Sequence, residues 1–93
     1  MKKFVLDAWA LLALLQGEEP AASRVKRLLE EAQAQRVTLF ISVINLGEVF
    51  YRIGQLKGEG EARKTLTEIH CLSLTVVSAT DERVFAAAAL KIR

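Results

Sequence analysis

Two acidic residues lie where a folded chain could bring carboxylates together. Asp7 directly follows the apolar run Phe4–Leu6, and Glu48 lies in the largely apolar segment Leu46–Phe50. If Phe4–Leu6 is a buried strand, Asp7 stands at its carboxyl end, where ligands bind in open α/β sheets. Two carboxylates that converge repel each other, and a hard divalent cation such as Mg²⁺ or Mn²⁺ relieves that repulsion. The two acids are therefore a candidate metal site.

Both acids also have an ordinary structural interpretation. Asp is among the best N-cap residues, so Asp7 could cap the helix that follows it, and one side chain could serve both roles. Glu48 could form an i,i+4 ion pair with Arg52, which stabilises a helix by only about 0.2–0.5 kcal/mol. Gly47, beside Glu48, costs about 1 kcal/mol inside a helix, so we expect another element to approach closely there. From the residues alone, both interpretations stay open.

Three further residues could carry chemistry, and each has a simpler explanation. Asp81 falls in the first turn of the last expected helix, where the helix dipole favours a negative charge without any metal. His70 and Cys71 are adjacent, but the sequence holds one histidine and one cysteine, too few for a zinc site. We expect His70 near a helix end and Cys71 as a small buried residue.

Hydrophobic patterns predict strands and helices in regular alternation along the chain. Short apolar or β-branched runs predict strands at Phe4–Leu6, Val37–Ile41 and Leu74–Ser78. Composition and helical spacing predict helices over Ala8–Gln16, from Pro20 past Ala32, from the cap Ser42 to about Lys57, over Glu61–Ile69, and after the cap Thr80. The order β-α-α-β-α-α-β-α predicts an α/β fold with a short parallel sheet and right-handed crossovers.

Length and composition narrow the class of protein. At 93 residues the chain is expected to form a single domain over residues 1–93. A net charge of +2 does not create a strong positive potential for binding nucleic acids, but metal ions could supply positive charge locally. The lone cysteine rules out an internal disulfide, and no run reaches the roughly 20 apolar residues of a membrane span. We expect a cytoplasmic protein without a membrane segment.

Three segments resemble the motifs of PIN domains. Val5–Leu15 is similar to the family's opening, where a strand ends in Asp and runs into a Leu/Ala helix. Ile41–Val49 is similar to the second motif, a strand, a Ser or Thr, and a helix that carries the second acid. Val76–Asp81 and the Ala-rich segment after it fit the third βα unit. One departure is Trp9, which stands where the family often has a small Ser or Thr.

The resemblance implies a three-layer α/β/α fold and Mg²⁺- or Mn²⁺-dependent cleavage of RNA, most often as the toxin of a VapBC-type toxin–antitoxin pair. It implies that Asp7 and Glu48 are catalytic metal ligands, with Asn45 and Ser42 nearby. The family's third and fourth acids and its C-terminal strands would fall beyond Arg93, so we expect a truncated PIN-like domain. Whether this chain alone is an active enzyme stays open.

The possible functions of the chain differ in the binding partners that they require. A ribonuclease would bind RNA, whereas a non-catalytic PIN remnant would bind an antitoxin protein or a second copy of the chain. In the family's sheet order, truncation would leave the first strand as an open edge, and open edges invite pairing. In the last expected helix, which follows the cap Thr80, the stretch Val84–Ile92 leaves almost no polar face, and we expect such a helix to need neighbours on several sides. We therefore expect a homo-oligomer that uses both features. A small receiver-like domain that shares only the β-α alternation is the third possibility.

Overall fold

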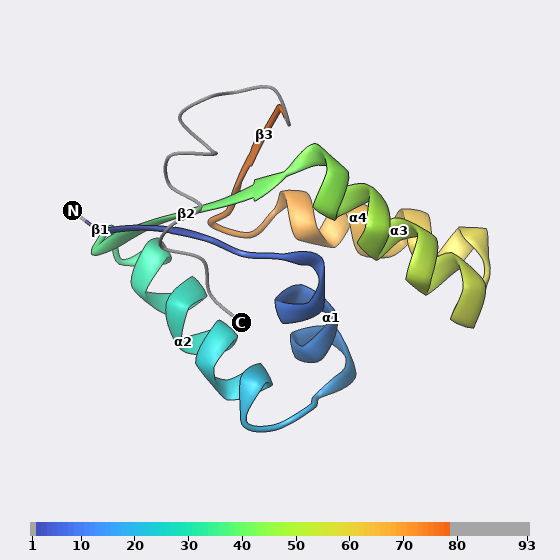
Figure 1. Cartoon of the computed structure of the whole chain (residues 1–93), viewed down its shortest axis with the longest axis horizontal. Helices are drawn as coiled ribbons and strands as arrows, with labels where there is room; N and C mark the ends of the chain where they lie inside the picture. Colours follow the sequence, from blue (N-terminus) through green and yellow to red (C-terminus); the bar gives the residue numbers. More distant parts are fainter. Residues whose placement is uncertain (1, 79–93) are drawn as a thin grey trace.

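In the computed structural model of the protein, residues 2–78 are described and form an α/β fold around a parallel sheet (Figure 1). The strands are β1 (Lys2–Val5), β2 (Val37–Ser42) and β3 (Thr75–Val77). The helices are α1 (Ala8–Gln16), α2 (Ala21–Gln33), α3 (Val43–Lys57) and α4 (Glu59–His70). This order confirms the predicted alternation as far as β3. The expected helix after Thr80 lies outside the described residues.

The strands lie in the order β1-β2-β3, and both neighbouring pairs are parallel. Phe4 lies opposite Leu39, and Ile41 lies opposite Val76. Each connection between parallel neighbours must cross over, and here a pair of helices makes each crossing. Because the strands are parallel, β1 and β2 end at the same edge of the sheet, and α1 and α3 begin there (Figure 1).

One face of the sheet supports the core. Side chains alternate along a strand, so Phe4, Leu39, Ile41 and Val76 share a face, and all four pack in two hydrophobic clusters. The first cluster joins β2 to three helices through Ala8, Leu11, Leu12, Ile41, Leu46, Val49, Ile53, Ala62 and Ile69. The second joins β2 to α1 and α2 through Leu6, Ala10, Val25 and Leu39, and Phe4 of β1 packs against it. Helix α1 contributes to both clusters and thus links the two halves of the core.

Helix α4 begins two residues earlier than the sequence predicted. Gly58 has a positive φ of 89°, so the chain turns sharply at this residue and α4 starts at Glu59. Glu59 then pairs with Arg63 at 2.9 Å, an i,i+4 arrangement that favours the helix. His70 is the last residue of α4, as predicted. Cys71 was predicted to be buried, and that is wrong, because it follows the helix end and is exposed.

Within residues 2–78, the helices are all too short or too polar to cross a lipid bilayer.

Replacing Ile41 by Ala is expected to destabilise the fold by about 2–5 kcal/mol, because its side chain is fully buried between the sheet and three helices. Urea denaturation measures this loss as a lower midpoint. The matched control is Ile44→Ala on the exposed side of α3, where Ile44 is 68% exposed and the change should stay within about 0.5 kcal/mol. Equal losses in the two variants would contradict this account of the core.

Candidate metal site

Asp7 lies at the carboxyl end of β1, in the position that the sequence predicted. Its side chain is 7% exposed, and among residues 2–78 it is the one buried side chain that is polar or charged. Its Oδ1 accepts a hydrogen bond of 2.8 Å from the backbone N–H of Ala10. Asp7 therefore caps α1, as the structural interpretation expected, and this contact holds a carboxylate in one orientation at the end of the strand.

Asn45 connects the beginnings of α1 and α3. Its Oδ1 accepts a hydrogen bond of 3.2 Å from the backbone N–H of Ala8, a residue 37 positions earlier. Its Nδ2 donates to the Oγ of Ser42 at 3.2 Å, and its own backbone N–H donates to the same oxygen at 3.1 Å. Ser42 therefore caps α3 and also orients the amide of Asn45. Through this amide, the residue next to Asp7 is tied to the helix that carries Glu48.

Glu48 forms the ion pair that the structural interpretation predicted. The Nε of Arg52 donates to its Oε1 at 3.1 Å, and both side chains are less than half exposed. The guanidinium carbon of Arg52 also lies 5.1 Å from the centre of the Trp9 ring, within the range of a cation–π contact. Trp9 is two residues beyond Asp7 in α1. A second connection, through Arg52, thus joins the segments that carry the two acids.

No pattern in the sequence indicates the contact between Arg52 and Trp9. Its partners are more than forty positions apart, and only the packing of α1 against α3 brings them together. The structure places Asp7, Asn45, Ser42 and the helix of Glu48 at one edge of the sheet.

Gly47 does not mark a close approach of another element. A Cβ atom built at this position would meet nothing within 4 Å, so the predicted approach is wrong. The buried side of α3 is formed by Leu46, Val49 and Ile53, whereas Gly47 lies on its exposed side. A closer approach occurs at Gly54, where an added Cβ would lie 3.9 Å from that of Ala62 in α4. Gly47 therefore leaves the surface of α3 beside Glu48 without a side chain.

The donor atoms at this edge fit a hard divalent cation. The carboxylates of Asp7 and Glu48 and the amide oxygen of Asn45 are hard oxygen donors, which Mg²⁺ and Mn²⁺ prefer. Mg²⁺ commonly binds proteins through one or two carboxylates and completes its shell with water and substrate phosphates. Across residues 2–78, no three His, Cys, Asp or Glu side chains gather closely enough to hold a metal ion. This part of the chain therefore offers at most a pair of acids, and Asp81 lies outside it.

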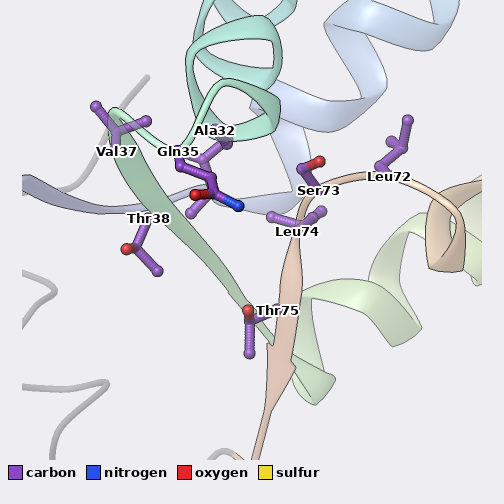
Figure 2. Close-up of a pocket in the computed structure, with 9 residues that line it drawn as sticks. Ala32, Gln35, Val37, Thr38, Leu72, Ser73, Leu74 and Thr75 are labelled. Carbon is purple, nitrogen blue, oxygen red and sulfur yellow. The ribbon is translucent and has the colours of Figure 1, made fainter.

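A pocket elsewhere in the fold has different chemistry (Figure 2). It lies where β2 and β3 begin, whereas Asp7 and Ser42 lie where β1 and β2 end. The pocket and the candidate site are therefore at opposite ends of the strands. Its lining is formed by Ala32, Gln35, Val37, Thr38, Leu39, Leu72, Ser73, Leu74 and Thr75. None of these side chains carries a carboxylate, imidazole or thiol. The pocket is therefore no alternative metal site.

The family model described as PIN domain matches residues 4–93. The match covers nearly the whole chain and includes both Asp7 and Glu48. Searches of curated proteins and of solved structures found no match.

Replacing Asn45 by Ala is expected to cost about 1–3 kcal/mol of stability, because the N–H of Ala8 loses its partner and the beginnings of α1 and α3 are no longer tied. Thermal or urea unfolding measures the change. The control is Gln55→Ala on the same helix, because the Gln55 side chain donates only to the exposed Tyr51 hydroxyl and its loss should cost less than about 0.5 kcal/mol. An Asn45→Ala variant as stable as the control would show that this tie does not hold the two helices together.

Proposed function

This chain belongs to the PIN-domain family, and we propose that it is a metal-dependent ribonuclease of the toxin–antitoxin type. Asp7 and Glu48 are its metal-binding acids, and Mg²⁺ or Mn²⁺ is its cofactor. The observation that carries the proposal is the pair of connections, Ala8 to Asn45 and Trp9 to Arg52, that hold the two acid-bearing segments at one edge of the sheet. Ligands of open α/β sheets bind outside the carboxyl ends of the strands, and α1 and α3 begin at those ends of β1 and β2.

Each residue of the site has a distinct part in this proposal. When bound, the metal would supply positive charge at the scissile phosphate and activate a water for hydrolysis. The buried Asp7 presents a carboxylate whose orientation is already fixed by its hydrogen bond to Ala10. Glu48 is more exposed, and its contact with Arg52 holds it near the site while leaving it free to change partner. Asn45 keeps the two segments at a constant separation.

The charge of Arg52 suits a phosphodiester substrate. A guanidinium matches phosphate geometry better than an ammonium does, and this one lies beside Glu48. Because the net charge of the chain is only +2, a few local contacts and the metal must supply most of the attraction for RNA. We further propose that the protein acts in the cytoplasm and that an antitoxin protein is its regulatory partner.

Replacing either acid by its amide, in Asp7→Asn or Glu48→Gln, is expected to lower the rate of Mn²⁺-dependent RNA cleavage by about 100-fold or more, because the metal loses a charged ligand. The measurement is the initial cleavage rate of single-stranded RNA, and calorimetric titration with Mn²⁺ follows metal binding in parallel. The matched control is Glu59→Gln, which removes a second i,i+4 Glu–Arg pair within residues 2–78, that of Glu59 with Arg63. This control should cleave RNA at the original rate.

Cleavage that continues undiminished in both acid variants would contradict the proposal. Mn²⁺ affinity equal in Glu48→Gln and Glu59→Gln would contradict the assignment of Glu48 to the metal.

A second candidate is a non-catalytic module that binds a second copy of the chain or an antitoxin. The observation in its favour is that β1, among the described strands, pairs only with β2 and so lies at a sheet edge. Against it, β1 has four residues and begins with the exposed Lys2 and Lys3, and short, lysine-bearing strands resist edge pairing. The apolar Val84–Ile92 segment, predicted to share this interface, lies outside the described residues. We therefore rank this function second.

Light scattering at micromolar concentration separates the two candidates. The binding module is expected to show the mass of a dimer or larger oligomer and no acid-dependent RNA cleavage. A monomeric mass would contradict oligomerisation, and cleavage that depends on Asp7 and Glu48 would contradict the non-catalytic role.

A further inference from the structure

Trp9 is a large aromatic side chain at an unusual place, the second residue of α1, two positions after Asp7. It is 64% exposed, although neighbouring residues of the same helix such as Ala8, Ala10 and Leu11 are buried. An exposed tryptophan loses the stabilisation that burial of its ring would give. The core therefore does not account for its presence at the site.

Arg52 holds the ring from one side. Its guanidinium carbon lies 5.1 Å from the centre of the indole, and its Nε is fixed by the 3.1 Å contact with Glu48. Arg52 thus contacts both Trp9, in the first turn of α1, and Glu48, in the middle of α3. A ring that is held from one side and largely open to solvent is a preformed surface for another flat group.

We propose, on the basis of the proposed ribonuclease function, that Trp9 is a stacking platform for an unpaired RNA base. This base would lie beside the scissile phosphate, at which the metal bound by the two acids would act. Trp9 is in this view a specificity-determining residue that favours single-stranded RNA. Aromatic side chains stack bases with little dependence on sequence, because every base has a π-face. In an A-form duplex the bases are already stacked inside the helix and cannot reach the indole.

The charges around Trp9 favour a nucleic acid over a protein partner. A protein that covered the ring would also cover Arg52 and Glu48, whose charges lose hydration when they are buried. An RNA strand brings phosphates, which are suitable partners for the guanidinium, together with a flat base for the indole. The low net charge of the chain makes such a local contact more important, because no broad basic field is present to hold RNA.

The test uses the intrinsic fluorescence of Trp9, the only tryptophan in the sequence. The 93-residue chain is titrated with an oligouridylate of about ten nucleotides, within the usual range of single-strand sites, in EDTA so that no divalent ion supports cleavage. A duplex RNA of the same length is titrated in parallel. Stacking is expected to quench the fluorescence with the single strand to saturation, and to leave it almost unchanged with the duplex.

Variants measured by fluorescence anisotropy of labelled oligouridylate separate stacking from other roles. Trp9→Ala is expected to weaken binding about 5- to 150-fold, whereas Trp9→Phe keeps a ring and should stay within about threefold of the original. The matched control is Tyr51→Ala, which removes another exposed aromatic side chain, 57% exposed on α3, and should bind as the original does. Circular dichroism verifies that each variant folds.

Three results would overturn the proposal. The first is no quenching by the single strand, and the second is equal affinity of Trp9→Ala and the original protein. The third is a change in oligomeric mass of Trp9→Ala with unchanged RNA affinity, which would assign the ring to a protein interface. Acid-dependent RNA cleavage without Trp9 quenching would leave the ribonuclease function standing and remove only the platform. Quenching by the single strand, with no acid-dependent cleavage when Mn²⁺ is present, would keep the stacking platform and remove the ribonuclease function.

Discussion

The hydrogen bond from the N–H of Ala8 to the side chain of Asn45 is the contact on which the site depends. A parallel sheet brings the ends of β1 and β2 to one edge but does not fix how the helices that follow them meet. The Asn45 amide makes that connection, and Ser42 orients the amide while capping its own helix. The same few atoms therefore begin both helices and fix the distance between the two acid-bearing segments.

Arg52 adds a second connection with a different character. Its contact with Glu48 lies within one helix and is partly exposed, so it contributes little to stability. Its contact with Trp9 crosses to α1 and keeps an aromatic ring beside the acids. The buried, capped Asp7 is thus the enclosed part of the site, and Glu48, Arg52 and Trp9 form its solvent-facing side. Such a division suits a site that must admit both a metal ion and a strand of nucleic acid.

The features that depend on local sequence were predicted well. The order of strands and helices followed from hydrophobic patterns, and Asp7 and Ser42 were identified as caps because capping is a contact within one turn. The pair of Glu48 with Arg52 is local in the same sense. The family was also identified correctly, because each of its first two motifs joins a strand to a helix and carries an acid at a fixed place, which can be seen in the sequence.

Contacts between distant segments were not predictable in this way. No local pattern indicates that Asn45 binds Ala8, or that Arg52 lies over Trp9, since both contacts arise when α1 packs on α3. Gly47 was misinterpreted for the same reason: a glycine in a helix can mark a close approach or open space, and only the packing decides. Cys71 was predicted to be buried because a free cysteine is usually a buried residue, but it follows the end of α4 and is exposed.

The central claim is that one metal ion binds to both Asp7 and Glu48. Its most direct test is the broadening of backbone amide signals in a nuclear magnetic resonance spectrum when a small amount of paramagnetic Mn²⁺ is added. If the site is shared, the amides of Asp7, Asn45 and Glu48 are expected to broaden first and together, before those of exposed acids such as Glu18 and Glu19. Broadening that begins at the exposed acids, or that reaches one of the two site acids without the other, would contradict a shared metal site.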